Sequence, residues 1–135
     1  LHIISRNPFI MVDGAHNVDG MKALAEYMKT VKNRKVLMLG IAEDKEAEEM
    51  VKIIVPLFEQ VIVTEGNYKP MDAEQLARIV KKYRPVKAIK DSRKAFEKAK
   101  ELQGNDMLLI TGSLYLLGDV LPVMKKETIA AQQSF

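Results

Sequence analysis

The sequence contains no cysteine, which excludes disulfide bonds and metal sites built from thiolates. It also lacks any apolar run long enough to cross a membrane, and its first residues show no signal-peptide pattern. Aromatic residues are few, and the net charge is only +3, from 21 basic and 18 acidic side chains. Lysine and arginine are spread over several predicted helices, so the basic stripe typical of nucleic-acid binding is missing. We therefore expect a cytoplasmic protein that binds neither nucleic acid nor a membrane, although its mild positive charge could help to attract an anionic ligand.

Several common catalytic motifs are absent as well. The sequence contains neither the Gly-x-x-x-x-Gly-Lys-Ser/Thr phosphate loop nor the Gly-x-Gly-x-x-Gly dinucleotide fingerprint. The two histidines, His2 and His16, do not form a paired-histidine metal motif. Asp13, His16 and Ser113 together suggest a catalytic triad. We do not expect one, because Asp13 and His16 share a single turn and no oxyanion motif lies nearby.

The 135 residues are enough for one domain with a substantial core, and 47% of them are hydrophobic and 29% charged, as in ordinary globular proteins. Continuous apolar runs at 9–12, 36–39 and 107–110 predict strands buried on both faces. Residues 61–64 predict a further strand, and 86–89 a short one. Segments with helical spacing of apolar residues follow each of them. This alternation predicts a mostly parallel sheet between helix layers, an α/β domain of the Rossmann-like three-layer αβα type. Residues 1–5 predict a short additional edge strand, hairpinned onto 9–12.

Capping residues predict where the helices begin and end. They are Asn17 and Asp44 before the first two helices, Asp72 with Gln75 before the third, and Gly104 after the fourth, which begins near Ser92. The last helix carries Leu114, Leu117, Val120 and Leu121, and Pro122 leaves its end undetermined. We expect a single domain over residues 1–128, followed by a frayed tail over 129–135.

Four polar loops follow strands of this predicted sheet, at 13–17, 40–44, 65–69 and 111–113. Because parallel strands end at the same edge of a sheet, we expect these loops to face one side of the domain, where open α/β sheets bind ligands. His16 could bind an anion or carboxylate, since its charge is tunable near neutral pH. Thr111-Gly112-Ser113 places hydroxyl groups at a helix N-terminus, where exposed N–H groups favour anions.

Each of these residues also has a purely structural interpretation. Asn17 is favoured as a helix cap over a ligand, and Ser113 suits a cap as well as a ligand. A lone histidine such as His16 is normally structural or simply exposed. Asp13 has the weakest structural explanation, because an acidic side chain directly after a buried strand gains little from packing.

The run Asp13-Gly14-Ala15-His16-Asn17, followed by Gly20, resembles the carboxy-terminal-domain signature of folylpolyglutamate synthases and dihydrofolate synthases, members of the Mur ligase superfamily. The preceding Asn7-Pro8 fits the same pattern. Residues 40–45, Gly-Ile-Ala-Glu-Asp-Lys, are similar to the family's Gly-x-x-x-Asp-Lys-Asp segment, with Glu46 in place of the final Asp. Residues 111–116, Thr-Gly-Ser-Leu-Tyr-Leu, match its closing motif. The resemblance spans essentially the whole chain.

The resemblance implies a domain of an ATP-dependent ligase that adds glutamate to a folate. In that family a central domain carries the phosphate loop and the magnesium ligands, and ATP phosphorylates the terminal carboxylate of the folate. The amine of glutamate then attacks the acyl phosphate. By resemblance, Asp13, His16 and Ser113 would hold the incoming glutamate, with Asp13 suited to its ammonium group and His16 and Ser113 to a carboxylate. Asn17 would border the nucleotide.

The phosphate loop, the magnesium site and most of the folate pocket of that family are missing from this sequence. We therefore expect that ATP and magnesium are bound mainly by a central domain absent from this chain, that an N-terminal ATPase domain of the same protein is the partner, and that the isolated domain neither hydrolyses ATP nor ligates. Two alternatives remain open. One is a Mur-type ligase that joins an amino acid to a cell-wall precursor, and the other is a stand-alone Rossmann-like binding module without catalysis.

Overall fold

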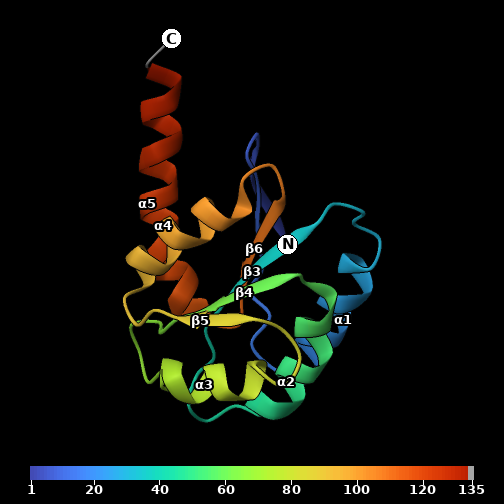
Figure 1. The fold of residues 1–135 in the computed structure, drawn as a ribbon. Helices are drawn as coiled ribbons and strands as arrows, with labels where there is room; N and C mark the ends of the chain where they lie inside the picture. Colours follow the sequence, from blue (N-terminus) through green and yellow to red (C-terminus); the bar gives the residue numbers. More distant parts are fainter. Residues whose placement is uncertain (134–135) are drawn as a thin grey trace.

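A computed structural model describes the backbone of residues 1–133 and the side chains of residues 1–126. It forms a six-stranded sheet between two layers of helices (Figure 1). In chain order the elements are β1 (His2–Arg6), β2 (Phe9–Val12), α1 (Val18–Met28), β3 (Lys35–Leu39), α2 (Ala47–Ile54), η1 (Val55–Leu57), β4 (Gln60–Val63), α3 (Ala73–Val80), β5 (Val86–Ala88), α4 (Ser92–Gln103), β6 (Met107–Thr111) and α5 (Leu114–Gln133). The predicted fold class is confirmed.

The strands lie in the order β1-β2-β6-β3-β4-β5. Every neighbouring pair is parallel except β1 and β2, which pair antiparallel as the predicted edge hairpin. The strands alternate their apolar side chains between the two faces, because successive residues of a strand point to opposite sides. In β3, Leu37 and Leu39 face one core while Val36 and Met38 face the other. Continuous apolar runs therefore correspond to strands covered on both faces.

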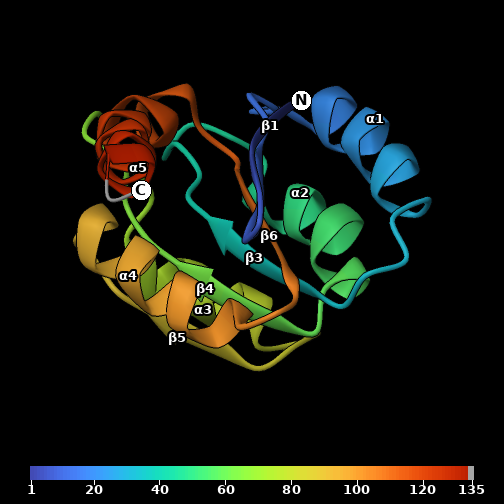
Figure 2. The same ribbon diagram turned by 90° about the horizontal axis from the view of Figure 1, so that it is seen from above.

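Helices α1, α2 and α3 cover one face of the sheet, and α4 and α5 cover the other (Figure 2). Strand β6 lies between β2 and β3, but the chain leaves it for α5, on the face opposite to α1 and α2. The connections after β2 and β6 thus diverge to opposite faces at the carboxyl edge of the sheet. This divergence is the arrangement that opens a ligand crevice in doubly wound sheets.

Most predicted helix ends are confirmed. Asn17 caps α1 by accepting a hydrogen bond from the backbone N–H of Gly20 at 2.8 Å. Asp72 accepts from the N–H of Gln75 at 3.1 Å, which supplies one half of the predicted capping box. Helix α4 begins at Ser92 and has Gly104 as its C-cap residue, with a φ of 50°.

The predicted cap at Asp44 is wrong. Helix α2 begins at Ala47, with Glu46 as the N-cap residue and no capping hydrogen bond from its side chain. The segment before it is held by the neighbouring loop instead, because the N–H of Glu43 donates to the carbonyl of Lys69 at 2.9 Å. Residues 42–45 form a separate turn, in which the N–H of Lys45 donates to the carbonyl of Ala42 at 3.2 Å, and the helix begins after it.

The last helix is longer than the sequence pattern indicated. Helix α5 includes Pro122 and continues to Gln133, so its backbone runs through 129–133, where we expected a frayed tail. Figure 1 shows this end of α5 extending beyond the sheet. The residues after Pro122 are mostly good helix formers such as lysine, alanine and glutamine, which explains why one missing N–H does not end the helix. Residues 134–135 lie outside the described part of the chain.

Candidate functional site

The turn after β2 is braced by the first residue that follows the strand. The N–H of Asp13 donates to the carbonyl of Ile110 on β6 at 3.0 Å, which extends the ladder by one residue. Its side-chain Oδ1 accepts from the N–H of Ala15 at 2.8 Å, a local turn that aspartate forms readily. The other carboxylate oxygen, Oδ2, lies 3.1 Å from the amino nitrogen of Leu1. Asp13 therefore uses one carboxylate oxygen to shape the turn, and the other takes no part in it.

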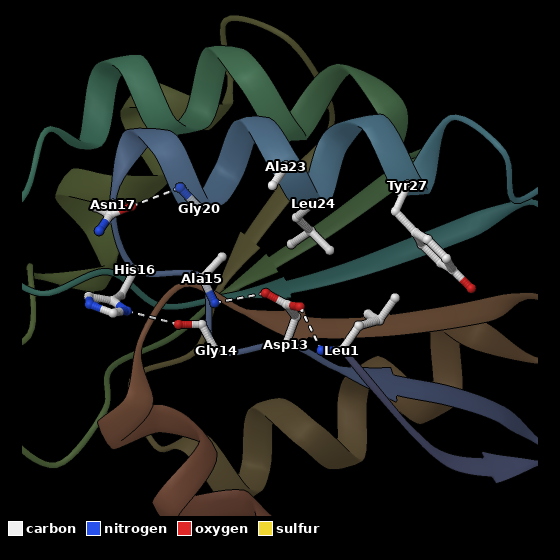
Figure 3. Close-up of a pocket in the computed structure, with 10 residues that line it drawn as sticks. All are labelled: Leu1, Asp13, Gly14, Ala15, His16, Asn17, Gly20, Ala23, Leu24 and Tyr27. Atoms are coloured by element: carbon white, nitrogen blue, oxygen red, sulfur yellow. Dashed lines mark hydrogen bonds and ion pairs between the residues drawn. The ribbon is translucent and has the colours of Figure 1, made fainter.

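His16 is oriented by a contact within the same turn. Its Nδ1 lies 2.9 Å from the carbonyl oxygen of Gly14. Since a carbonyl can only accept, Nδ1 must carry the proton, which leaves Nε2 to accept a hydrogen bond in the neutral ring or to donate one in the imidazolium. Figure 3 shows the imidazole of His16 pointing away from the carboxylate of Asp13, on the other side of Gly14. The half-buried ring is thus fixed by one nitrogen and offers the other to a ligand.

The turn after β6 packs directly against the turn after β2. The hydroxyl of Thr111 donates to the carbonyl of Asp13 at 2.8 Å, and the N–H of Gly112 donates to the carbonyl of Ala15 at 3.1 Å. Gly112 has a φ of 108°, and a Cβ added there would lie 2.2 Å from the carbonyl oxygen of Gly40. Only glycine fits this position, for its backbone conformation and for space.

Ser113 is the N-cap residue of α5. Its hydroxyl oxygen accepts from the N–H of Tyr115 at 3.1 Å and from that of Leu116 at 3.3 Å. The side chain is buried, with 5% of its surface exposed. Because a hydroxyl also has one hydrogen to donate, the cap does not use its full hydrogen-bonding capacity.

Two hollows open beside these turns. The α1 hollow, of about 470 Å³, lies between the 13–17 turn and α1 and is bordered by Leu1, Leu24 and Tyr27 (Figure 3). The four-loop hollow, of about 570 Å³, is lined by His16, residues 42–45, Tyr68, Lys69 and residues 112–115. Every one of the four loops expected at the carboxyl edge contributes to it, so their predicted convergence is confirmed.

The chain also matches a known protein family. Residues 1–114 match the family model described as Mur ligase, glutamate ligase domain. The chain belongs to this family. Within it, the chain is 26% identical over 136 aligned residues to a dihydrofolate synthase/folylpolyglutamate synthase of Bacillus subtilis, covering 93% of this chain and 30% of that protein. It is 29% identical to a UDP-N-acetylmuramoyl-L-alanyl-D-glutamate–2,6-diaminopimelate ligase of Helicobacter pylori, covering 96% of this chain and 30% of that protein.

A solved structure of one such ligase has the same fold over most of this chain. Mycobacterium tuberculosis folylpolyglutamate synthase complexed with ADP superposes with a TM-score of 0.84 at 25% identity, over 92% of this chain and 31% of that chain. The chain thus spans about 30% of the length of the ligases that it matches. The resemblance to the Mur ligase superfamily, inferred from the Asp-Gly-Ala-His-Asn motif, is confirmed.

In this Mur-ligase-type domain the predicted site residues are divided between the two hollows. His16 and Ser113 line the four-loop hollow, whereas Asp13 and Asn17 line the α1 hollow. His16 borders both of them. A ligand that contacts Asp13 and Ser113 together would therefore have to pass across His16.

Four further side chains line the four-loop hollow, and the sequence analysis assigned none of them a role. Lys45 and Lys69 bring ammonium groups to it, and Tyr68 and Tyr115 bring aromatic rings. Lys69 has a φ of 41°, a conformation that a non-glycine residue rarely adopts. The local sequence Tyr-Lys-Pro does not predict a positive φ at Lys69, because this conformation arises when the loop docks against residues 42–43.

The resemblance implies magnesium, an ion that proteins bind through carboxylate and other oxygen ligands. Among residues 1–126, no group of three or more histidine, aspartate or glutamate side chains could hold a metal ion. Among the described residues, no helix is both long and apolar enough to span a membrane.

Proposed function

We propose that this chain is the glutamate-receiving domain of an ATP-dependent ligase that joins glutamate to a folate. The observation that carries the proposal is the convergence of the Asp-Gly-Ala-His-Asn turn with three other loops on one hollow, in a domain of the Mur ligase glutamate ligase family. The similarity to the Bacillus subtilis synthase supports folate as the acceptor. As in the family it resembles, ATP would phosphorylate the folate carboxylate, and the amine of glutamate would displace phosphate to form the amide.

Glutamate would lie across His16, with its charged groups toward the two hollows. Asp13 lines the α1 hollow, and its Oδ2 is the carboxylate oxygen that does not shape the turn. In the complex, the ammonium group of glutamate would bind at this oxygen. At the other end, the Nε2 of His16 and the hydroxyl of Ser113 would bind a carboxylate, and the first N–H groups of α5 favour an anion there. Lys45 adds a positive charge to the same hollow.

The nucleotide would border Asn17, whose side-chain oxygen caps α1 and whose amide N–H groups remain on the exposed side of the turn. ATP and magnesium would be held mainly by a central domain of the longer ligase. An acyl phosphate needs phosphate and metal clamps that this sequence does not contain. The isolated chain should therefore neither hydrolyse ATP nor form an amide. ATP turnover by the purified chain that disappears in His16→Ala would contradict this.

A cell-wall ligase is the second candidate, because the chain is 29% identical to the diaminopimelate-adding ligase of Helicobacter pylori. The two candidates differ in the acceptor, a folate or a muramoyl peptide, and in the amino acid that is added. The Asp-Gly-Ala-His-Asn motif favours the folate ligase. A stand-alone binding module without catalysis is the third interpretation, and it predicts no ligation by any longer form of the protein.

The role of His16 is tested by steady-state kinetics on the full-length ligase. His16→Ala should chiefly raise the KM for glutamate, because the imidazole would contact the bound amino acid, and it should leave the KM for ATP unchanged. His2→Ala is a matched control, since His2 is the other histidine and lies exposed on β1. A defect in His16→Ala confined to ATP binding would assign the histidine to the nucleotide instead.

A further inference from the structure

Two tyrosine rings meet at the mouth of the four-loop hollow. Tyr68 lies in the loop between β4 and α3, and Tyr115 lies in the first turn of α5. Their ring centroids are 4.8 Å apart, and the ring planes are inclined by 39°. Despite this contact, 51% of Tyr68 and 46% of Tyr115 remain exposed, and the neighbouring Leu114 is 57% exposed. Large apolar side chains gathered on the rim of a concave site usually mark a binding surface.

The loop that carries Tyr68 is held in place from both ends. A Cβ added at Gly66 would lie 2.9 Å from the backbone nitrogen of Leu116, so the loop touches the backbone of α5 at this glycine. At the other end, the carbonyl of Lys69 accepts from the N–H of Glu43 at 2.9 Å, and the N–H of Met71 donates to the carbonyl of Ile41 at 2.8 Å. The ring of Tyr68 is therefore presented by an anchored backbone and not by a free loop.

Lys69, the residue after Tyr68, has a strained backbone conformation. Its φ of 41° is unfavourable for a side chain with a Cβ, and the following Pro70 further restricts its backbone. Its ammonium nitrogen lies 5.5 Å from the centroid of the Tyr68 ring. Strain of this kind persists where the surrounding structure over-determines it, and it concentrates at ligand sites.

We propose that Tyr68 and Tyr115 form a stacking surface for the planar aromatic ring of a substrate. This inference rests on the proposed function, which supplies two substrates with such a ring: the folate and the adenine nucleotide. Side chains of both charges line the hollow, Glu43 and Asp44 as well as Lys45 and Lys69, so beyond the carboxylate site at His16 and Ser113 the exposed rings and not a net charge would recognise the substrate. A concave site of about 570 Å³ also has the size of a small-molecule site.

The chain itself provides the spectroscopic test. It contains four tyrosines and no tryptophan, so ring-labelled tyrosine gives few NMR signals, which Tyr→Leu variants assign. The probes are 4-aminobenzoyl-glutamate, for the folate ring, and ADP, for adenine. We expect one of them to shift the ring signals of Tyr68 and Tyr115, and we expect Tyr68→Leu combined with Tyr115→Leu to weaken its binding about tenfold or more.

Tyr83 is the internal reference, because it is half-buried after the end of α3 and lines neither hollow. Shifts at Tyr68 and Tyr115 with 4-aminobenzoyl-glutamate alone would assign the surface to the acceptor, and shifts with ADP alone would assign it to the nucleotide. Equal shifts at Tyr83, Tyr68 and Tyr115, or no shift at Tyr68 and Tyr115 with either probe at several millimolar, would overturn the proposal.

A parallel titration with free glutamate separates this inference from the proposed function. Glutamate should move the imidazole signals of His16 and leave those of His2 unchanged. If glutamate moves His16 while neither aromatic probe moves the two tyrosines, the stacking surface fails and the glutamate site stands. If the tyrosines respond and His16 does not, the glutamate site fails and the stacking surface stands.

Discussion

Replacement of Gly112 by alanine should disrupt the junction on which the site is built. The residue has a φ of 108°, and the added methyl carbon would lie 2.2 Å from the carbonyl oxygen of Gly40 and 2.9 Å from the Cδ1 of Leu39. The backbone conformation alone costs an alanine about 1–3 kcal/mol. The overlap costs about as much again, because the atom in the way belongs to the backbone after β3 and cannot rotate aside. We expect Gly112→Ala to lower the free energy of unfolding by about 4 kcal/mol.

Two other glycines separate the conformational cost from the steric one. Gly104 also has a positive φ, of 50°, but nothing lies within 4 Å of an added Cβ. Gly104→Ala should therefore cost about 1–3 kcal/mol from backbone strain alone. Gly118 lies inside α5 with open space around it, so Gly118→Ala should be neutral or stabilise the protein by up to about 1 kcal/mol.

Urea unfolding of the three variants, with midpoints compared at equal slope, measures these differences. The expected order of stability is Gly118→Ala, then Gly104→Ala, then Gly112→Ala. If Gly112→Ala unfolds at the same urea concentration as Gly104→Ala, the close approach of the β6–α5 turn to β3 is refuted, together with the geometry of the four-loop hollow.

Further predictions concern the cap, the core and pH. Ser113→Ala should cost about 1 kcal/mol in urea unfolding through loss of the cap and should also weaken glutamate binding; an unchanged glutamate affinity would make Ser113 a cap only. Leu109→Ala, in the fully buried centre of β6, should cost about 2–5 kcal/mol in the same assay, and a loss under 1 kcal/mol would contradict the packing. The N–H of Lys94, and to a smaller extent that of Arg93, lowers the pKa of Asp91 below its ordinary value of 3.8. The stabilisation from the Asp91 carboxylate is therefore complete above pH 3.8 and is lost as the pH falls through the lowered pKa. Asp91→Asn should thus unfold more easily than the wild type near neutral pH and equally easily in strong acid. A difference that persists in strong acid would contradict this assignment.

The sheet could be predicted from the sequence because its strands are short, continuous apolar runs. Residues 107–110, Met-Leu-Leu-Ile, can be buried on both faces only in a central strand, and β6 is such a strand. Asn17 and Ser113 were recognisable as cap residues for an equally local reason. The convergence of the four loops followed from parallel strands alone, whatever the strand order.

The features that could not be predicted depend on contacts between distant segments. Asp44 has the residue type of a cap, but residues 42–45 form a separate turn beside Lys69, and α2 begins after it. The Tyr68–Tyr115 pair joins a loop to a helix 47 positions further along the chain, and the close approach at Gly66 that permits it has no signature in the local sequence. The division of Asp13 and Ser113 between two hollows was hidden for the same reason, because the orientation of side chains around His16 is set by the packing of two turns.

A ligase assay on the full-length protein, with ATP, magnesium and glutamate, tests the central claim most directly. A reduced folate, dihydropteroate and a muramoyl precursor are offered in parallel, and the masses of the products are followed. The account predicts a gain of one glutamate on the folate; the same gain on dihydropteroate would add dihydrofolate synthase activity. Product from the muramoyl precursor alone, or from none of the three acceptors, would contradict it.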